Sequence, residues 1–134
     1  MSSFRLQIVT PEGLKLDSQV EALHLRTTEG YVSIRAGHTD YLAVLDIGIV
    51  TVTMDGKERK AACSGGFLSV KRGEAQLMAT AFEYAEDIDI ARAQAAQKRA
   101  EAQIAASKDG AQIELAKVKL ARALNRMKVS GKGA

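Results

Sequence analysis

The chain has 134 residues, of which 46% are hydrophobic and only 4% aromatic, so it fits one or two small globular domains with a mainly aliphatic core. It contains no apolar run of the roughly 18 residues that a membrane-spanning helix needs, and no Cys and His cluster of the kind that binds metal. Its single cysteine, Cys63, excludes an internal disulfide, and we expect a reducing compartment.

The net charge of +3 is unevenly distributed along the chain. Residues 1–84 contain 9 Lys and Arg against 10 Asp and Glu, whereas residues 85–134 contain 10 against 6. A basic segment of this kind is commonly a solvated face, and it can also meet an anionic partner. We do not expect that partner to be nucleic acid, because no aromatic side chains for base stacking accompany the charge.

The first half of the chain predicts short strands separated by turns. The alternating segments FRLQIVT and VEALHLRT are typical of half-buried strands. Further candidates are EGYVSI, YLAVL, GIVTVTM, KAACS, GFLSVK and AQLMATAF, with turn signals at Asp55–Gly56 and Gly65–Gly66. About nine such strands predict an antiparallel sandwich or barrel over residues 1–84. Because no long helix interrupts them, we do not expect parallel strand–helix–strand units.

No catalytic motif accompanies these strands. His24 lies inside a strand pattern, where a structural role is expected, and His38 lies in the loop AGHTD. Neither histidine has a nucleophile or an acid at a recognisable spacing, so we do not expect catalysis. The Gly65–Gly66 pair is not followed by the GK[ST] of a phosphate-binding loop.

Residues 85–134 predict two helices joined as an antiparallel hairpin. Asp87 or Asp89 can cap the first helix, whose body ARAQAAQKRAEAQIAA contains no Pro or Gly. The segment Ser107–Gly110 predicts a break, and a second helix follows from about Ala111 to Val129. Its apolar stripe comprises Ile113, Ala116, Leu120, Leu124 and Met127. Since the first helix offers mostly alanine to its neighbour, we expect the hairpin to be weakly held.

Four arginines can come together in such a hairpin. Arg92 and Arg99 share a face of the first helix, and Arg122 and Arg126 share a face of the second. The start of one helix lies beside the end of the other, so the four guanidinium groups can approach and repel one another unless an anion lies among them. Guanidinium matches phosphate oxygens in a bidentate way. The alternative interpretation is ordinary surface ion pairing, such as Asp89 with Arg92.

The ordered set of segments resembles the epsilon subunit of rotary proton-translocating ATP synthases over the whole chain. The segments that carry the resemblance are FRLQIVTPEG, TTEGYVSIRAGHTDYLAVLDIG, CSGGFLSV and ATAFEYAEDIDIARA. The chain departs from the family at Ala36-Gly37-His38, where many relatives have Pro-Gly-His, and at Thr39-Asp40, where relatives often have Ala-Pro. The resemblance implies an N-terminal β-sandwich over 1–84, which binds gamma and the membrane c-ring, followed by a mobile two-helix regulatory domain over 85–134.

The same resemblance implies a role and a setting. The protein is expected to be a non-catalytic central-stalk subunit that couples proton-driven rotation to ATP synthesis. Its helices permit activity as a hairpin, and they inhibit ATP hydrolysis when extended along gamma into the alpha and beta subunits of the catalytic head. The expected location is peripheral, on the cytoplasmic face of a bacterial membrane, with the plastid thylakoid as the other setting. The alternative function is a free-standing small-molecule-binding β-sandwich with a helical interaction tail.

The segment IDIARA matches the I/L-D-x-x-R-A motif of family members that bind ATP. The resemblance assigns ATP contacts to these residues: Glu83, Ile88, Asp89, Arg92, Ala93, Arg99, Arg122 and Arg126. ATP is then a regulatory ligand, alone or with Mg, and the protein requires no cofactor or metal site. Contacts with gamma and the rotor ring are assigned to Gly30, Tyr31 and His38.

Overall fold

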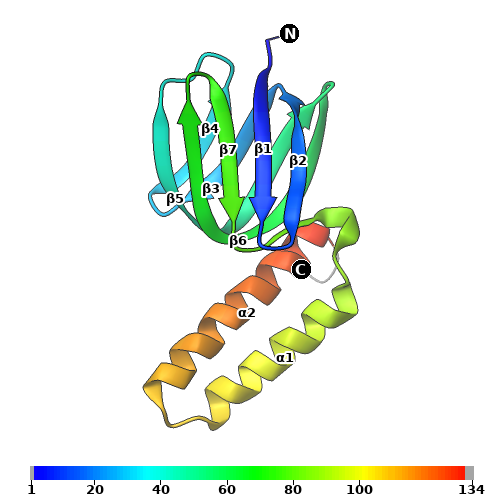
Figure 1. Cartoon of the computed structure of the whole chain (residues 1–134). Helices are drawn as coiled ribbons and strands as arrows, with labels where there is room; N and C mark the ends of the chain where they lie inside the picture. The colour runs from blue at the N-terminus through cyan, green and yellow to red at the C-terminus, as the bar shows by residue number, and fades with distance from the viewer. Residues whose placement is uncertain (1, 132–134) are drawn as a thin grey trace. The chain divides into compact units, whose positions relative to one another are not determined.

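A computed structural model describes residues 2–131, and the chain divides into two compact units, Met1–Tyr84 and Ala85–Ala134 (Figure 1). The described part of the first unit consists of strands β1 Phe4–Thr10, β2 Gly13–Val20, β3 Ala22–Thr27, β4 Gly30–Arg35, β5 Tyr41–Met54, β6 Lys57–Lys71, β7 Glu74–Ala79 and β8 Phe82–Tyr84. The second consists of a short 3₁₀ helix η1 Ala85–Asp87 and two helices, α1 Ile90–Ala106 and α2 Gly110–Ser130. Neither helix carries, within residues 2–131, an apolar stretch long enough to cross a membrane.

The strands form a sheet with the order β2-β1-β7-β6-β5-β3-β4, and β8 pairs with β6. The sheet folds into two layers around one aliphatic core, which confirms the predicted sandwich followed by helices (Figure 1). The other strand pairs are antiparallel, as predicted, and the exception is β1 with β7, which pair in parallel from Leu6↔Ala75 to Val9↔Met78. A parallel pair requires a long crossover, and here the intervening strands rather than a helix provide it.

Two long strands replace four of the predicted short ones. YLAVL and GIVTVTM lie in the single strand β5, and KAACS and GFLSVK lie in β6. The first part of β6 pairs with β8 and the second part with β7, so the strand changes partner at Gly65–Gly66. Strand β2 was not predicted, although Leu14, Leu16 and Val20 alternate with polar residues in its sequence. At a register shift in β1, Leu16 pairs with Ile8 and the exposed Leu14 pairs with Val9.

The two helices are capped by local side chains and packed through alanine. Asp89 Oδ1 accepts a hydrogen bond from the Arg92 backbone N–H at 3.0 Å, and Asp109 Oδ1 accepts one from Ala111 N–H at 2.9 Å. Gly110 therefore begins α2 rather than ending α1. The almost fully buried alanines are Ala93, Ala100, Ala116 and Ala123. Leu124, predicted in the apolar stripe, is 44% exposed, because the neighbouring Ala123 takes the buried position.

Replacing Gly66 by Ala should destabilise the sandwich by about 2–4 kcal/mol, since two costs combine at this position. Its φ is +114°, and an added Cβ would collide with the Met78 carbonyl oxygen and lie 2.8 Å from Ala79 Cα. Gly73→Ala is the matched control: its φ is +78° but nothing lies within 4 Å of the added Cβ. Urea unfolding should give Gly73→Ala a loss of only about 1 kcal/mol. Equal losses for the two variants would contradict the steric argument.

Asp89 should stabilise α1 as an N-cap, independently of any ligand. Asp89→Ala should lower the unfolding free energy of the second unit by about 1 kcal/mol, whereas Asp89→Asn, which also caps well, should cost only about 0.3–0.5 kcal/mol. Thermal unfolding followed by far-ultraviolet circular dichroism measures both losses without nucleotide. If Asn is as harmful as Ala, the hydrogen bond to Arg92 N–H is not what holds this helix start.

Candidate functional site

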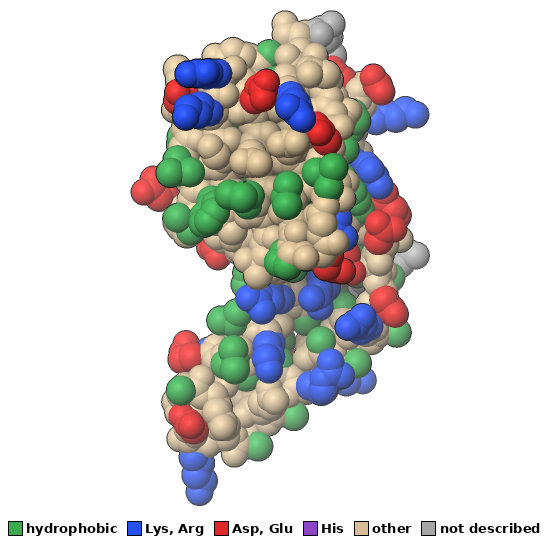
Figure 2. All heavy atoms as spheres, in the orientation of Figure 1, with side chains coloured by type: hydrophobic (Ala, Val, Ile, Leu, Met, Phe, Trp, Pro, Cys, Tyr) green, Lys and Arg blue, Asp and Glu red, His purple; other side chains and the backbone are tan. Residues whose placement is uncertain are grey.

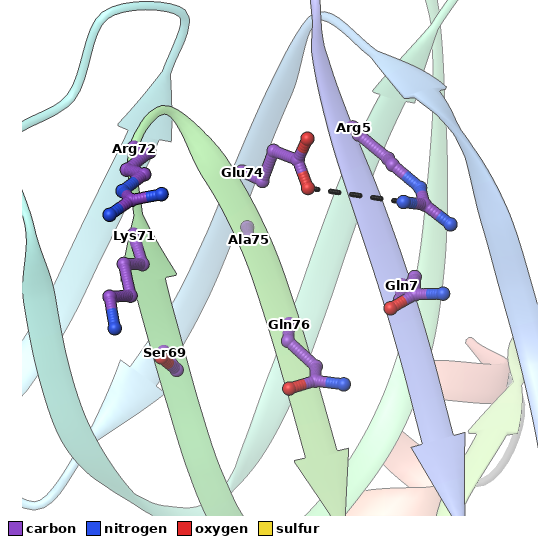
Figure 3. Close-up of a pocket in the computed structure, with 8 residues that line it drawn as sticks. All are labelled: Arg5, Gln7, Ser69, Lys71, Arg72, Glu74, Ala75 and Gln76. Carbon is purple, nitrogen blue, oxygen red and sulfur yellow. Dashed lines mark ion pairs between the residues drawn. The ribbon is translucent and has the colours of Figure 1, made fainter.

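A polar hollow lies on the outward face of β1, β6 and β7 and has a volume of about 500 Å³ (Figure 3). Its Arg5 side chain is already paired, with Nη2 3.0 Å from Asp17 Oδ2 and Nη1 3.9 Å from Glu74 Oε2. The hydrogen bonds between Arg5 and Asp17 raise the pKa of the guanidinium and lower the pKa of the carboxyl. A cation that is already paired in this way gives little attraction for a further anion, so this hollow is the weaker candidate.

A second hollow, the interhelical groove, lies between α1 and α2 and has a volume of about 290 Å³. It is lined by Ala96, Arg99, Ala100, Gln103, Lys119, Arg122 and Arg126. Four of these side chains are cationic and none is acidic. Figure 2 shows several Lys and Arg side chains close together on the viewed face of the helices. A hollow with this lining attracts an anion with several negative oxygens.

One lining residue of the groove carries a buried hydrogen-bond donor without an acceptor among residues 2–131. Arg122 Nε is buried and has no hydrogen-bond partner within the described residues. A buried donor without a partner costs about 1–3 kcal/mol, and such groups are rare in folded proteins. An anion in the groove can supply the acceptor, because guanidinium donors match carboxylate and phosphate oxygens.

The structure brings together three of the four arginines predicted to form an anion clamp, Arg99, Arg122 and Arg126. It does not place Arg92 among the lining residues of the groove, and the Arg92 side chain is exposed near the start of α1. The alternative ion pair between Asp89 and Arg92 is absent from the described residues, because the Asp89 carboxylate accepts from the Arg92 backbone instead.

The other predicted ATP contacts have different surroundings. Ile88 and Ala93 are buried, and Asp89 caps α1. Glu83 belongs to the first unit, in β8. The sequence analysis missed Lys119, although its spacing of three and seven residues from Arg122 and Arg126 places it on the same helix face and could have revealed it.

The residues assigned to rotor contacts lie around β4. Gly30 begins this strand with φ +121°, and Tyr31 is half exposed and stacks on His24 with ring centroids 5.1 Å apart. His24 Nδ1 lies 2.8 Å from Ser33 Oγ, so this histidine has a structural partner. In the following turn, His38 Nδ1 lies 2.7 Å from the Thr39 carbonyl oxygen.

An apolar row crosses the outward face of the sandwich. The strand registers place its members side by side, in the order Leu14, Val9, Met78, Phe67 and Val44. All but Val9 are 39% to 61% exposed, and Leu42, 74% exposed, lies next to the row on β5. Figure 2 shows hydrophobic side chains crossing the viewed face of the sandwich. A contiguous exposed apolar surface of this kind is a candidate contact surface for a partner.

The described residues offer little for covalent or metal chemistry. Burial raises the pKa of the Cys63 thiol to about 12, so it is not a nucleophile at neutral pH. Within residues 2–131, no group of three or more His, Cys, Asp or Glu side chains could hold a metal ion. The groove and the apolar row are therefore the two candidate binding surfaces among the described residues.

Two family models match the chain, one for each unit. Residues 3–85 match the β-sandwich domain of the ATP synthase delta/epsilon chain, and residues 86–131 match its long α-helix domain. The chain is 40% identical over 131 residues to the ATP synthase epsilon chain of Bacillus velezensis, covering 98% of this chain and 99% of that one. It is 35% identical over 133 residues to the epsilon chain of Ruminococcus albus, with coverages of 98% and 99%.

Among solved structures, the fold is similar to a chain in the OSCP/F1/c-ring structure of the Euglena gracilis mitochondrial ATP synthase. The TM-score is 0.82 at 26% identity, covering 93% of this chain and 79% of that one. A chain of the Tetrahymena thermophila central stalk and c-ring has the same fold, with a TM-score of 0.64 at 15% identity and coverages of 95% and 96%. The chain therefore belongs to the ATP synthase epsilon chain family.

Proposed function

We propose that the second unit is an ATP-responsive regulatory switch in an ATP synthase, in which the chain serves as the epsilon subunit of the central stalk. The observation that carries this proposal is the interhelical groove, where Arg99, Arg122 and Arg126 line one hollow without any acidic side chain. The buried and unpartnered Arg122 Nε adds a donor that a phosphate oxygen can satisfy. ATP acts here as a regulatory ligand, with or without Mg, and not as a substrate of this chain.

The nucleoside end of ATP lies toward the start of α1 in this proposal. Ile88, Asp89, Arg92 and Ala93 form the IDIARA motif there, and the Asp89 carboxylate would repel phosphate but can accept hydrogen bonds from ribose or base. Glu83 is the remaining proposed contact. The phosphates then occupy the arginine-lined part of the groove, where guanidinium groups bind them in a bidentate way.

The switch follows from the weak packing of the hairpin. Ala93, Ala100, Ala116 and Ala123 let the helices approach closely, but a buried CH₂ contributes only about 0.8 kcal/mol, so an alanine contact stabilises far less than a leucine contact. The cations of the groove oppose this packing by mutual repulsion. A ligand anion converts that repulsion into attraction, and so favours the hairpin over the extended form.

The free energy by which ATP favours the hairpin can be estimated from its affinity and concentration. ATP that binds only the hairpin shifts the population by its difference in affinity for the two forms. A site of micromolar affinity at millimolar ATP supplies about 4 kcal/mol, and moving a population from 1:99 to 99:1 needs about 5.5 kcal/mol. ATP can therefore bias the switch strongly without being its only control. In the extended form, the basic α2 would contact the beta and alpha subunits and inhibit ATP hydrolysis.

The first unit is proposed to be the rotor-binding domain, with gamma seated on the apolar row. The row crosses five strands, β2, β1, β7, β6 and β5, and burial of such a surface against a partner is favourable. Gly30, Tyr31 and His38 are proposed contacts with gamma or the c-ring. The chain performs no catalysis in this proposal and lies peripherally on the cytoplasmic face of a bacterial membrane. A gamma pull-down separates this role from that of a free-standing ligand-binding sandwich, which would ignore gamma.

ATP at millimolar concentration should raise the melting temperature of the isolated full chain by at least about 5 °C, because it stabilises only the hairpin form. Arg126→Ala should abolish the rise, since its guanidinium lines the groove. Lys98→Ala, an exposed position of α1 outside the groove, should keep it. Differential scanning calorimetry measures all three shifts, and a wild type that does not respond to ATP would contradict the proposed regulation.

Deleting everything after Glu86 should leave assembly with gamma intact and raise ATP hydrolysis by the assembled complex several-fold, because the inhibitory helices are gone. Steady-state phosphate release from the reconstituted complex measures the effect. Unchanged hydrolysis would mean that the helices do not inhibit.

Val44→Asp tests the first unit separately from the helices, because it places a charge in the apolar row. This variant should lose gamma in a pull-down and keep the ATP-induced rise in melting temperature. Gln76→Asp, on the same outward face but outside the row, should retain gamma. Retention of gamma by Val44→Asp would remove the apolar row from the proposed interface.

A further inference from the structure

We infer that Lys119 binds the phosphate farthest from the nucleoside, so that the affinity of the interhelical groove depends on the length of the polyphosphate chain. This inference rests on the proposed ATP site and assigns a residue to it that the ATP-binding motif does not include. Lys119 lines the same hollow as Arg99, Arg122 and Arg126. Its ammonium group has no hydrogen bond or ion pair within the described residues, whereas Lys117 Nζ lies 3.3 Å from Glu114 Oε1.

The order of the cations along α2 gives the groove a direction. Lys119, Arg122 and Arg126 follow each other at spacings of three and four residues, so they form one row of about 10 Å along the helix axis. In the antiparallel hairpin, Arg126 lies toward the start of α1, and η1, which precedes α1, contacts α2. Lys119 lies farther from the start of α1, near the middle of α2 and on the side of Arg122 toward the turn between the helices.

The charges at the two ends fix which end of the ligand lies where. The Asp89 carboxylate caps the start of α1, and a negative group there repels phosphate. Toward the other end, a second hollow of about 440 Å³ adjoins the groove and shares Gln103 and Lys119 with it, and none of its lining residues is acidic. Asp109, which caps α2 at the turn, precedes Lys119 by ten residues and lines neither hollow. A polyphosphate chain therefore extends away from Asp89 and ends at Lys119.

Lys119 thus adds a charge that only the longest phosphate chain reaches. A diphosphate held by Arg126 and Arg122 ends before it, whereas a triphosphate extends one group further. Lysine suits this position because its ammonium is a mobile point charge on a flexible stem, which can follow a terminal phosphate without demanding a fixed bidentate geometry.

Isothermal titration of the purified full chain with ATP, ADP and inorganic tripolyphosphate tests the inference. Lys119→Met keeps the length of the side chain and removes its charge, and it should weaken ATP and tripolyphosphate binding roughly tenfold, the effect of losing one charged hydrogen bond. ADP binding should change less than about threefold by the same measure. Lys119→Arg should restore most of the loss, and the matched control Lys117→Met, on the same helix but outside the groove, should bind like the wild type.

Each other outcome has a distinct meaning. If the wild type binds ATP and Lys119→Met binds it equally well, or loses ATP and ADP equally, the assignment of Lys119 is wrong while ATP regulation stands. If the wild type binds tripolyphosphate but not ATP, and Lys119→Met weakens it, the polyphosphate groove is supported and ATP regulation is not. If the wild type binds neither, both are overturned. Circular dichroism of each variant confirms that the helices are formed.

Discussion

Alanine-on-alanine packing between α1 and α2 is the constraint on which the behaviour of the helical unit depends. The contact is close, since Ala93, Ala100, Ala116 and Ala123 are almost completely buried, but each contributes little apolar area. The same closeness brings the cations of the two helices to one groove, where they repel one another. The hairpin therefore combines weak apolar packing with cation repulsion, and in the proposed switch an anion in the groove relieves that repulsion.

The helices themselves do not depend on this packing to the same extent. Asp89 and Asp109 cap their own helices through hydrogen bonds to residues two or three positions away, and Gly131 ends α2 in a left-handed conformation. These contacts survive when the helices separate, because both partners lie in the same helix. The proposed switch between hairpin and extended states needs helices of this kind, whose end contacts do not involve the partner helix.

The sandwich is held by contacts of the opposite kind. Strands β5 and β6 pair along nearly their whole length, and the two layers share one core of fully buried side chains such as Leu6, Leu23 and Leu68. Side-chain contacts also stabilise the last strand, β8. Arg59 lies over the Tyr84 ring, 3.6 Å from the ring centroid, and the Phe82 ring packs edge-on against the Tyr84 ring. The order of the sandwich thus extends to the final residue of the unit, and the apolar row on its outer face is presented on rigid strands.

Much of the fold could be read from local pattern. Alternation in FRLQIVT and VEALHLRT predicted β1 and β3 because each strand has one buried face. Strand β2 was missed although its sequence alternates. Strands β5 and β6 were each predicted as two strands, because glycine resembles a turn signal when it stands inside a long strand. Leu124 was misplaced for a related reason: periodicity favours the larger apolar residue, and close helix contact selects the smaller one.

The sequence by itself determined the two helices, the choice of Asp87 or Asp89 as the cap of the first, the uneven charge and the arginines that could form a clamp. These features depend on neighbours within a few residues. The cap of the second helix, Asp109, became evident only in the structure. Only the tertiary structure decided that Arg99, Arg122, Arg126 and Lys119 line one groove while Arg92 does not. Only the strand registers aligned Val9, Met78, Phe67 and Val44 into one row. The physical reason is the same in both cases. Side chains from distant segments become neighbours through the rotation and register of packed elements, and local sequence does not encode these.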